Sequence, residues 1–167
     1  GGTTRRAAKM VVLDVDHPEI EDFVNWKVEE ERKVKALMDA GYSGDYEGEA
    51  YQSVSGQNSN NSIRVNNAFF EALENDDEWH LTARTDGSTI RTINARDLWH
   101  QVAHAAWDCA DPGIQFDTTI NEWHTCPQDG RINGSNPCSE YMFLDDTACN
   151  LASLNVRRFY DEDKLEF

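Results

Sequence analysis

Three chemically active side chains stand at alternate positions in the C-terminal part of the chain: Asn136, Cys138 and Glu140. Pro137 lacks an N–H group and favours extended backbone at the residue before it, so this segment is predicted to be a loop and not a helix. In an extended segment, side chains two residues apart point to the same side. An amide, a thiol and a carboxylate would then share one pocket. There they could orient hydroxyl groups, exchange a hydrogen atom or an electron at sulfur, and move a proton.

The four cysteines leave more than one kind of site open. They are Cys109, Cys126, Cys138 and Cys149. A zinc site could use His124, Cys126 and two further thiols, but successive cysteines are 17, 12 and 11 residues apart and form no Cys-x-x-Cys pair. A zinc deaminase would need His-x-Glu and Pro-Cys-x-x-Cys motifs, which the chain lacks. No metal is therefore predicted, and a plain buried thiol is the preferred interpretation of Cys109 and Cys126.

Composition and charge exclude several classes of protein. The 167 residues include 15 Lys and Arg against 31 Asp and Glu, giving a formal net charge of −16. A nucleic-acid binder needs a basic face for the phosphates, so nucleic acid is not expected as a partner. No apolar run approaches the roughly 20 residues of a membrane span, so no membrane is expected either. Hydrophobic residues make up 39% of the chain, which is enough to form a core.

Both ends of the sequence indicate a piece of a larger cytoplasmic protein. The basic residues Arg5 and Arg6 are not followed by the apolar segment of a signal peptide. In a reducing cytoplasm, a structural disulfide framework is the weaker interpretation of the cysteines. Residues 161–167 are typical of the opening of a further helix.

The N-terminal half predicts an α/β arrangement. Residues 10–15 are apolar and β-branched, as in a buried strand. Asp16 then stands as a helix N-cap before Pro18 and Glu19, and Gly41 is a good stop for that helix. Strand, short turn and amphipathic helix in this order favour an α/β fold.

Residues 41–62 are rich in turn formers, and residues 55–62 are too polar for a core element. We expect a surface loop there. The alternative is an active-site or interface loop, because long structureless loops in compact domains are often functional. A second helix is predicted over residues 63–75.

The remaining sequence alternates between strand and helix patterns. Strands at 79–85 and 88–93 flank Asp86-Gly87, a hairpin signal. A third helix is predicted over 95–110, and residues 114–118 alternate as in a strand. A stretch rich in Gly and Asn follows at 129–136. Residues 148–156 show an apolar strand pattern.

The segment Asn136-Pro137-Cys138-Ser139-Glu140 resembles the active-site finger loop of ribonucleotide reductases. The string from 111 to 155, with Gln-Phe-Asp-Thr-Thr-Ile-Asn at 115–121 and Trp-His-Thr-Cys-Pro at 123–127, is similar to the adenosylcobalamin-dependent, class II branch. The motif Ala-Cys-Asn-Leu-Ala-Ser-Leu-Asn at 148–155 and the loop at 1–10 add to it. The resemblance covers residues 1–159, and the combination of motifs is highly specific.

The resemblance implies an α/β barrel of ten strands, built from two half-barrels, with the finger loop threaded through its centre. Residues 1–167 would be a fragment of this catalytic barrel. Residues 1–9 would form the substrate and specificity loop, and residues 133–141 the finger loop with the radical cysteine.

The resemblance also implies catalytic roles for four residues. Cys138 would be the thiyl-radical residue that abstracts the 3′ hydrogen of a ribonucleotide, and Glu140 the general base at the 3′-hydroxyl. Asn136 would hydrogen-bond the ribose hydroxyls, and Cys149 would be half of the redox pair that delivers electrons.

Substrate-binding residues are implied as well. Gly1, Gly2, Arg5 and Arg6 match the loop that contacts the substrate base and responds to the bound effector. Ser135, beside the finger motif, is placed with them.

The implied cofactor is adenosylcobalamin, which would supply the first radical. The implied partners are a ribonucleotide substrate, dNTP or ATP effectors, and a thioredoxin-like reductant that restores the dithiol by exchange. The complete protein could be a homodimer. The cysteine partner of Cys149, the phosphate-binding segment and the shuttle cysteines are not matched, so we expect the isolated chain to be inactive. A partial barrel would also leave strand edges exposed.

Two alternatives remain open at this point. The first is the large subunit of a class I reductase, which takes its radical from a separate metal-containing subunit, although the short linker at 141–147 favours class II. The second is an acidic interaction domain whose thiols are structural.

Overall fold

A three-stranded parallel sheet forms the centre of the chain in the computed structural model, which describes residues 8–161, 163 and 164. Its strands are β1 (Lys9–Asp14), β2 (Ser59–Val65) and β5 (Gly113–Phe116), in the order β1-β2-β5. The α/β class predicted from sequence is confirmed. Within the described residues the sheet is open and no closed barrel forms.

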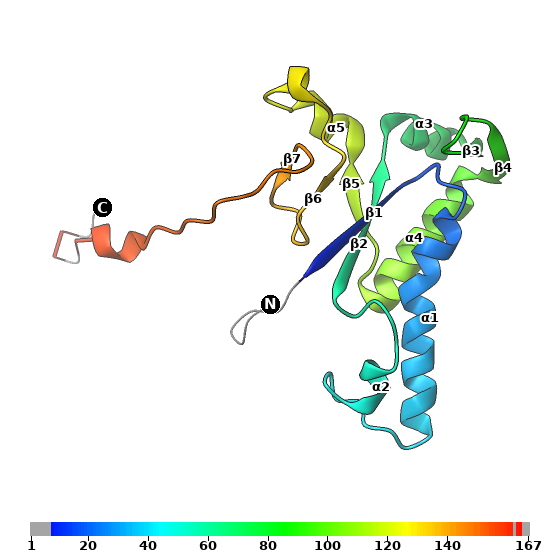
Figure 1. Cartoon of the computed structure of the whole chain (residues 1–167), viewed down its shortest axis with the longest axis horizontal. Coiled ribbons are helices and arrows are strands. Elements are labelled where there is room, and N and C mark those ends of the chain that lie inside the picture. The colour runs from blue at the N-terminus through cyan, green and yellow to red at the C-terminus, as the bar shows by residue number, and fades with distance from the viewer. Residues whose placement is uncertain (1–7, 162, 165–167) are drawn as a thin grey trace.

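Two long helices cover one side of this sheet (Figure 1). They are α1 (Ile20–Asp39), which connects β1 to β2, and α4 (Ala95–Cys109), which leads into β5. Each helix directs apolar residues at helical spacing into the core, including Ile20, Val24 and Val28 from α1 and Leu98 and Val102 from α4. Burial of this stripe against the sheet holds the layers together.

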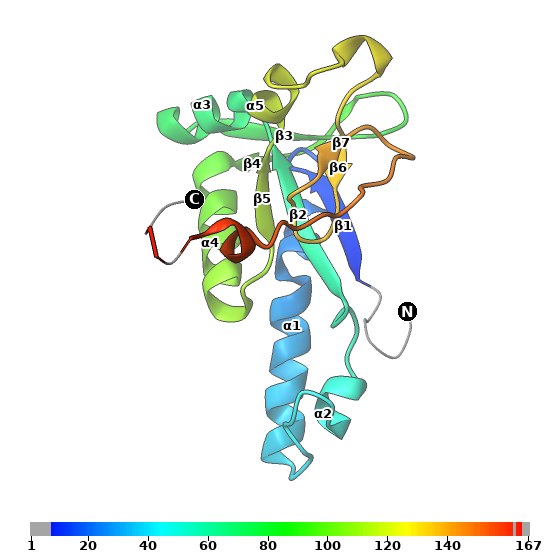
Figure 2. The same ribbon diagram turned by 90° about the vertical axis from the view of Figure 1, so that its left-hand side faces the viewer.

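Shorter elements complete the helical side. The short α2 (Glu49–Gln52) lies beside the C-terminal half of α1 (Figure 2). β3 (Glu78–Thr82) and β4 (Thr89–Asn94) form an antiparallel hairpin, and α3 (Asn67–Asn75) precedes it. Asn66 and Asn94 cap α3 and α4, because their side chains accept hydrogen bonds from backbone N–H groups in the first turn of each helix.

Several sequence predictions are confirmed. The first helix ends where Gly41 takes a φ of +97°, a conformation that favours glycine. The hairpin around Asp86-Gly87 and the helix at 95–110 both form. Among the described residues, no helix combines the length and the apolar character that crossing a membrane requires.

The predicted N-cap at Asp16 is wrong. The helix begins at Ile20 with Glu19 in the cap position and no side-chain cap bond. The Asp16 carboxylate instead accepts hydrogen bonds from Thr82 at 2.8 Å and Arg84 at 2.6 Å. Burial alone would raise the pKa of Asp16, but the bonds from Arg84 and Thr82 outweigh it and lower the pKa. Hydrogen bonds from Thr82 and Arg84, which are distant in sequence, therefore replace the N-cap bond that the local sequence predicts for Asp16.

The predictions for residues 55–75 are wrong in part. Residues 59–65, expected to divide between a polar loop and a helix, form the central strand β2, and the helix α3 begins only at Asn67. Asn61, Ser62 and Arg64 are buried there. The Arg64 guanidinium can be buried in this strand because Asp117, Gln115 and the carbonyl of Ile132 accept its hydrogen bonds.

The predictions for the C-terminal part of the chain are also wrong in part. The strand expected at 114–118 ends at Phe116, where α5 (Asp117–Glu122) begins. Residues 148–156, expected to form a strand, form none, and Leu151 and Leu154 are 69% and 83% exposed. This segment leads away from the sheet (Figure 1), so it has no neighbouring strand with which to bond. The helix expected at 161–167 falls largely outside the described residues.

We expect Phe69→Ala to destabilise the helical side of the sheet by about 3–5 kcal/mol, because it empties a fully buried site. Phe69 is 0% exposed, and its ring packs edge-on against Trp79 at 5.1 Å between centroids. Hydrogen exchange of α3 and β3 amides in the complete protein measures the loss. The matched control is Glu74→Ala on the exposed face of α3, expected within about 0.5 kcal/mol. Equal protection in the two variants would contradict the packing described here.

Candidate active site

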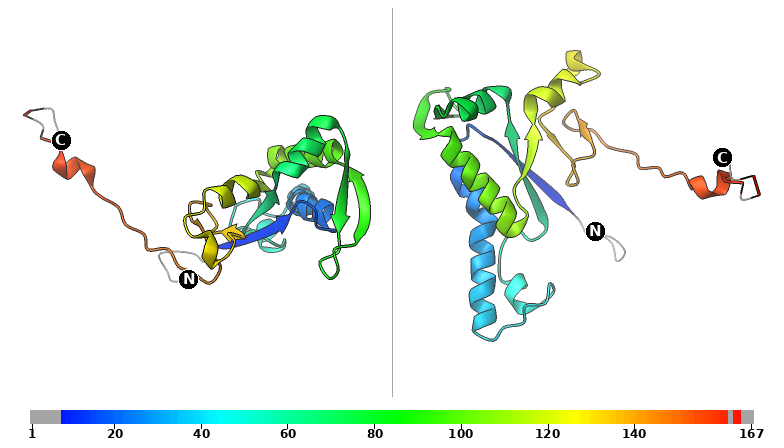
Figure 3. Two further views of the ribbon diagram at one scale, coloured as in Figure 1. Left: turned by 90° about the horizontal axis from the view of Figure 1, so that it is seen from above. Right: turned by 180° about the vertical axis from the view of Figure 1, so that it is seen from behind.

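The predicted finger motif lies in a hairpin on the sheet face opposite α1 and α4 (Figures 1 and 3). Its strands are β6 (Gly134–Ser135) and β7 (Met142–Phe143), and we call residues 134–143 the finger hairpin. The strand register shows which sheet residues share the face beneath it. They are Met10, Val12, Asp14, Asn60, Ser62, Arg64, Gly113 and Gln115.

The tip of the finger hairpin is a tight turn. The backbone N–H of Ser139 donates to the carbonyl of Asn136 at 3.0 Å, and the N–H of Tyr141 donates to Asn136 Oδ1 at 3.0 Å. Ser139 has a left-handed φ of +62°. The loop prediction is confirmed, but the extended conformation expected for Asn136, Cys138 and Glu140 is wrong, because these local bonds fold the segment back on itself.

The turn places the three side chains differently. Asn136 is half-buried and uses its Oδ1 within the turn, whereas Cys138 and Glu140 are exposed. The Cys138 thiol is free of any disulfide. The tip therefore offers a thiol and a carboxylate to solvent, while the amide also holds the backbone.

Side chains from two strands fix the hairpin to the sheet. Asn60 Nδ2, from β2, donates to the carbonyl of Pro137 at 2.7 Å. Gln115 Nε2, from β5, donates to Ser135 Oγ at 2.7 Å and to Ser139 Oγ at 3.4 Å. The residues on both sides of Cys138 are thus tied to the strands beneath.

A buried arginine fixes the chain segment that enters the hairpin. The Arg64 side chain is 1% exposed and donates to Asp117 Oδ1 from Nη2 at 2.6 Å and from Nε at 3.0 Å. The same Nη2 donates to the carbonyl of Ile132 at 2.7 Å. Asn121 bonds both backbone groups of Ile132, at 3.0 and 3.1 Å. Arg131 completes the cluster through a second ion pair with Asp117.

A pocket of about 330 Å³ beside the hairpin brings three predicted site residues together. Ser135, Asn136 and Cys149 all contribute to its lining, whereas Cys138 and Glu140 do not. Cys138 and Glu140 therefore lie outside this pocket, whereas Asn136 belongs both to the turn and to the pocket lining. Gly1, Gly2, Arg5 and Arg6, predicted to bind substrate, lie outside the described residues.

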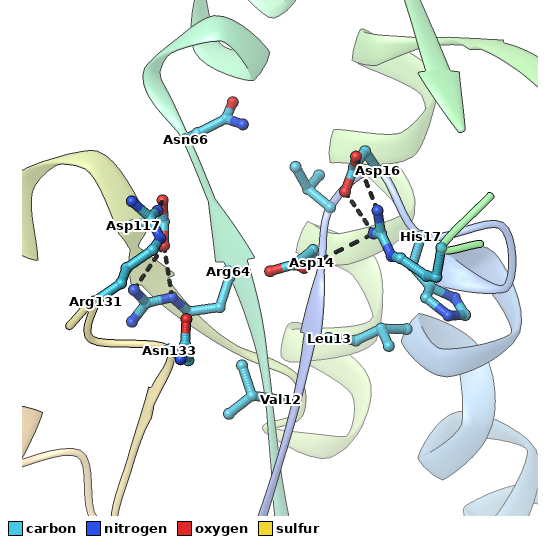
Figure 4. Close-up of a pocket in the computed structure, with 12 residues that line it drawn as sticks. Val12, Leu13, Asp14, Asp16, His17, Arg64, Asn66, Asp117, Arg131 and Asn133 are labelled. Atoms are coloured by element: carbon cyan, nitrogen blue, oxygen red, sulfur yellow. Dashed lines mark hydrogen bonds and ion pairs between the residues drawn. The ribbon is translucent and has the colours of Figure 1, made fainter. Parts of the chain in front are cut away.

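A larger pocket, of about 580 Å³, lies at the carboxyl ends of β1 and β2 (Figure 4). Two ion pairs flank it, Arg64 with Asp117 and Arg84 with Asp16, both at 2.6 Å. The hydrogen bond to Asp16, helped by the charge attraction, raises the pKa of Arg84. Because each guanidinium already has a carboxylate partner, this pocket presents balanced charge and not a cationic surface.

The remaining cysteines and the histidine considered for zinc occupy other surroundings. Burial raises the pKa of the Cys109 thiol, which supports its interpretation as a structural residue. Cys126 is half-buried, and the His124 ring packs edge-on against Phe143 at 5.7 Å. Among the described residues, no group of three or more His, Cys, Asp or Glu is arranged to hold a metal ion.

Sequence reasoning missed the residues that hold the finger hairpin: Asn60, Arg64, Gln115 and Asp117. A signal was available, since Asn60, Ser62 and Arg64 stand at alternate positions, as polar residues on one face of a strand do. The opposite face of β2 carries the polar residue Asn61 as well as Ile63 and Val65. Asn61 interrupts the alternation of polar and apolar residues, so the strand pattern was not recognised.

We expect Arg64→Met to cost about 3–5 kcal/mol, because it breaks an ion pair whose side chains are only 1% and 15% exposed and removes the bond to the carbonyl of Ile132. Hydrogen exchange of amides at 130–144 in the complete protein measures this loss as a lower free energy of local opening. The control is Arg84→Met, which removes a partly exposed arginine from the same pocket and should cost about 0–1 kcal/mol. Comparable losses in the two variants would show that the Arg64 pair does not anchor the hairpin.

Comparison with known proteins agrees with the motif. A model of the ribonucleotide reductase barrel domain matches residues 1–167. The vitamin B12-dependent ribonucleotide reductase of Streptomyces avermitilis is 60% identical over 163 residues, which cover 98% of this chain and 17% of that protein. The protein of the same name from Agrobacterium fabrum is 44% identical, with 96% of this chain and 18% of the relative covered.

A more distant relative gives the same result. The vitamin B12-dependent ribonucleoside-diphosphate reductase of Thermoplasma acidophilum is 32% identical, with 99% of this chain and 19% of the relative covered. The chain thus spans less than a fifth of the length of each of these relatives. Because the family match extends over every residue, the chain belongs to the ribonucleotide reductase family, as a part of its barrel domain.

Proposed function

We propose that the complete protein reduces ribonucleotides to deoxyribonucleotides by a thiyl-radical mechanism, and that this chain contributes the reacting thiol. The observation that carries the proposal is the Asn136-to-Glu140 motif at the tip of a hairpin anchored to the sheet, with the Cys138 thiol free and exposed. The relatives named as vitamin B12-dependent support the class II branch over class I.

The net reaction that we propose balances in atoms and electrons. The C2′–OH bond of the ribose breaks and a C2′–H bond forms, water leaves, and two thiols lose two electrons and two protons to become a disulfide. In this scheme the Cys138 thiyl removes the 3′ hydrogen atom and later returns it. The Glu140 carboxylate takes the proton of the 3′-hydroxyl, which assists loss of the 2′-hydroxyl as water.

Asn136 orients the ribose in this proposal. Its Oδ1 accepts the N–H of Tyr141 within the turn, so we assign its Nδ2 as the donor to a ribose hydroxyl oxygen. Ser135 lies in the same pocket and is assigned to substrate binding with the loop residues Gly1, Gly2, Arg5 and Arg6.

Cys149 supplies one of the two thiols that become the disulfide. It lines the pocket that Ser135 and Asn136 also line, which supports a role beside the ribose. The second thiol comes from a cysteine outside this chain. A thioredoxin-like dithiol protein then restores the pair by thiol–disulfide exchange.

The chemistry that adenosylcobalamin supplies when bound is the formation of an organic radical. The exposure of Cys138 at the hairpin tip fits this cofactor, because a radical formed outside the chain can reach the thiol directly. The chain's own contribution is to hold that thiol in place, through Asn60 and Gln115.

We also assign the remaining properties of the class to the complete protein. It binds dNTP or ATP effectors, works in the cytoplasm and forms a homodimer.

The test of the proposed function is an assay of ribonucleotide reduction with a dithiol, with and without adenosylcobalamin, and with no second subunit. Activity only with the cofactor supports the proposal, whereas a requirement for a separate radical-generating subunit would favour class I. A folded but inactive protein would favour the acidic interaction domain.

Cys138→Ser in the complete protein should abolish turnover, because an alcohol O–H does not give up its hydrogen atom as a thiol does. The fold should be retained, since the two side chains are similar in volume and the site is exposed. The control is Cys126→Ser, a half-buried cysteine outside the proposed machinery, which should keep wild-type kcat. Residual multiple turnover by Cys138→Ser would exclude Cys138 as the radical residue.

Glu140→Gln should lower kcat by about 10²–10⁴-fold, the usual contribution of a general acid or base. Steady-state kinetics of the complete protein with saturating cofactor measure this effect. The matched control is Glu122→Gln, an exposed glutamate at the end of α5, which should keep the wild-type kcat. A Glu140→Gln variant with the same kcat as this control would remove Glu140 from the mechanism.

A further inference from the structure

Gln115 is a polar side chain buried beneath the finger hairpin. It is 2% exposed, and it lies at the centre of β5 on the face that the hairpin covers. Its amide oxygen accepts a hydrogen bond from Arg64 Nη1 at 3.2 Å. Its amide nitrogen donates to Ser135 Oγ at 2.7 Å and Ser139 Oγ at 3.4 Å. The side chain thus connects the buried ion pair to both sides of the turn.

The donors and acceptors of these hydrogen bonds can be arranged in only one way. A guanidinium offers donors and no acceptor, so Arg64 requires the Gln115 oxygen on its side. The amide nitrogen must then face the hairpin, where it can only donate. Ser135 Oγ accepts this bond and donates its own hydrogen bond to the carbonyl of Asn136 at 2.8 Å. The charge of Arg64 therefore determines the hydrogen-bond direction up to the backbone of the finger motif.

We propose that Gln115 is a positioning residue for the reaction at Cys138, acting through Ser135 and Ser139. The proposal rests on the function proposed above. Ser139 follows Cys138 directly and holds a left-handed φ of +62°, which costs energy in a residue other than glycine. The bond from Gln115 to its hydroxyl, and the bond that this hydroxyl can donate to Ser135 Oγ at 3.3 Å, stabilise that conformation, so they fix the backbone that carries the thiol.

Two substitutions with side chains similar in length to glutamine separate the acceptor function of Gln115 from its donor function. Gln115→Met removes all hydrogen bonding from the side chain. Gln115→Glu keeps the acceptor for Arg64, but it can donate to Ser135 only when its carboxyl is protonated. In the complete protein, both should lower kcat by about 10²-fold at a pH where the carboxyl is ionised, the size of effect expected from misplacing a reacting group by about 1 Å. KM can change as well, because Gln115 bonds Ser135, which we assign to substrate binding, so kcat is the parameter that tests positioning at Cys138.

Comparison of the two variants distinguishes positioning from simple support of the fold. Arg64 Nη1 lies 3.2 Å from the Gln115 oxygen, so it favours the ionised carboxylate in Gln115→Glu, which cannot donate a hydrogen bond to Ser135. Gln115→Glu should therefore lose kcat as Gln115→Met does, although it keeps its bond from Arg64. Wild-type kcat in either variant would overturn the proposal.

A second readout does not depend on turnover. The rate at which iodoacetamide alkylates Cys138, followed by mass spectrometry, should change in Gln115→Met while the rate at Cys126 stays as in wild type. An unchanged alkylation rate at Cys138 would overturn the positioning role, whether or not the complete protein reduced nucleotides. Absence of nucleotide reduction is a different result, and it would contradict the proposed function. Should Gln115→Met fail to fold, Ser139→Ala replaces it. Alanine keeps the cost of the left-handed backbone but lacks the hydroxyl that receives the bond from Gln115, so a wild-type alkylation rate there would also contradict the inference.

Discussion

A buried guanidinium is the constraint on which the site depends. Removing the Arg64 charge from water costs several kcal/mol unless the protein supplies close partners. Here Asp117 takes two of its N–H groups, the carbonyl of Ile132 takes another bond, and Gln115 takes a further one. These partners lie on β5, at the start of α5 and in the segment that enters the finger hairpin. Neutralising one charge therefore brings three separate parts of the chain to a common position.

The sheet uses its two faces in opposite ways. Ile63 and Val65 point into the apolar core under α1 and α4, whereas Asn60, Ser62 and Arg64 point toward the hairpin. Parallel strands covered on both faces usually consist almost entirely of apolar residues. The polar face persists because the hairpin that covers it supplies hydrogen-bonding groups and not an apolar surface. The finger hairpin and β2 thus stabilise each other through these hydrogen bonds.

The sequence was sufficient wherever local signals agreed with the fold. Gly41, Asp86-Gly87 and the apolar stripe at 95–110 acted through local turn chemistry and helical periodicity, and their elements form as predicted. β2 was missed because the groups that bond its polar side chains, on Asp117 and Pro137, are distant in sequence. Asp16 was misassigned for the same reason, since Arg84 competes for its carboxylate. The motif at 136–140 was identified by its residue types, but its turn depends on hydrogen bonds that the sequence pattern does not display.

The two thiols proposed to act in turnover are held in different ways, and this difference suits their different tasks. Cys138 is anchored from beneath through its neighbours, since Asn60 holds Pro137 and Gln115 reaches Ser139. A hydrogen atom moves only over a short distance, so a rigid position helps. Cys149 instead begins the exposed segment that leads away from the sheet, with Leu151 and Leu154 open to solvent. A thiol that must meet a second cysteine, and then a reductant, gains from this accessibility. The anchoring of the hairpin and the exposure of the segment after it are therefore consistent with one site that separates hydrogen-atom transfer from electron delivery.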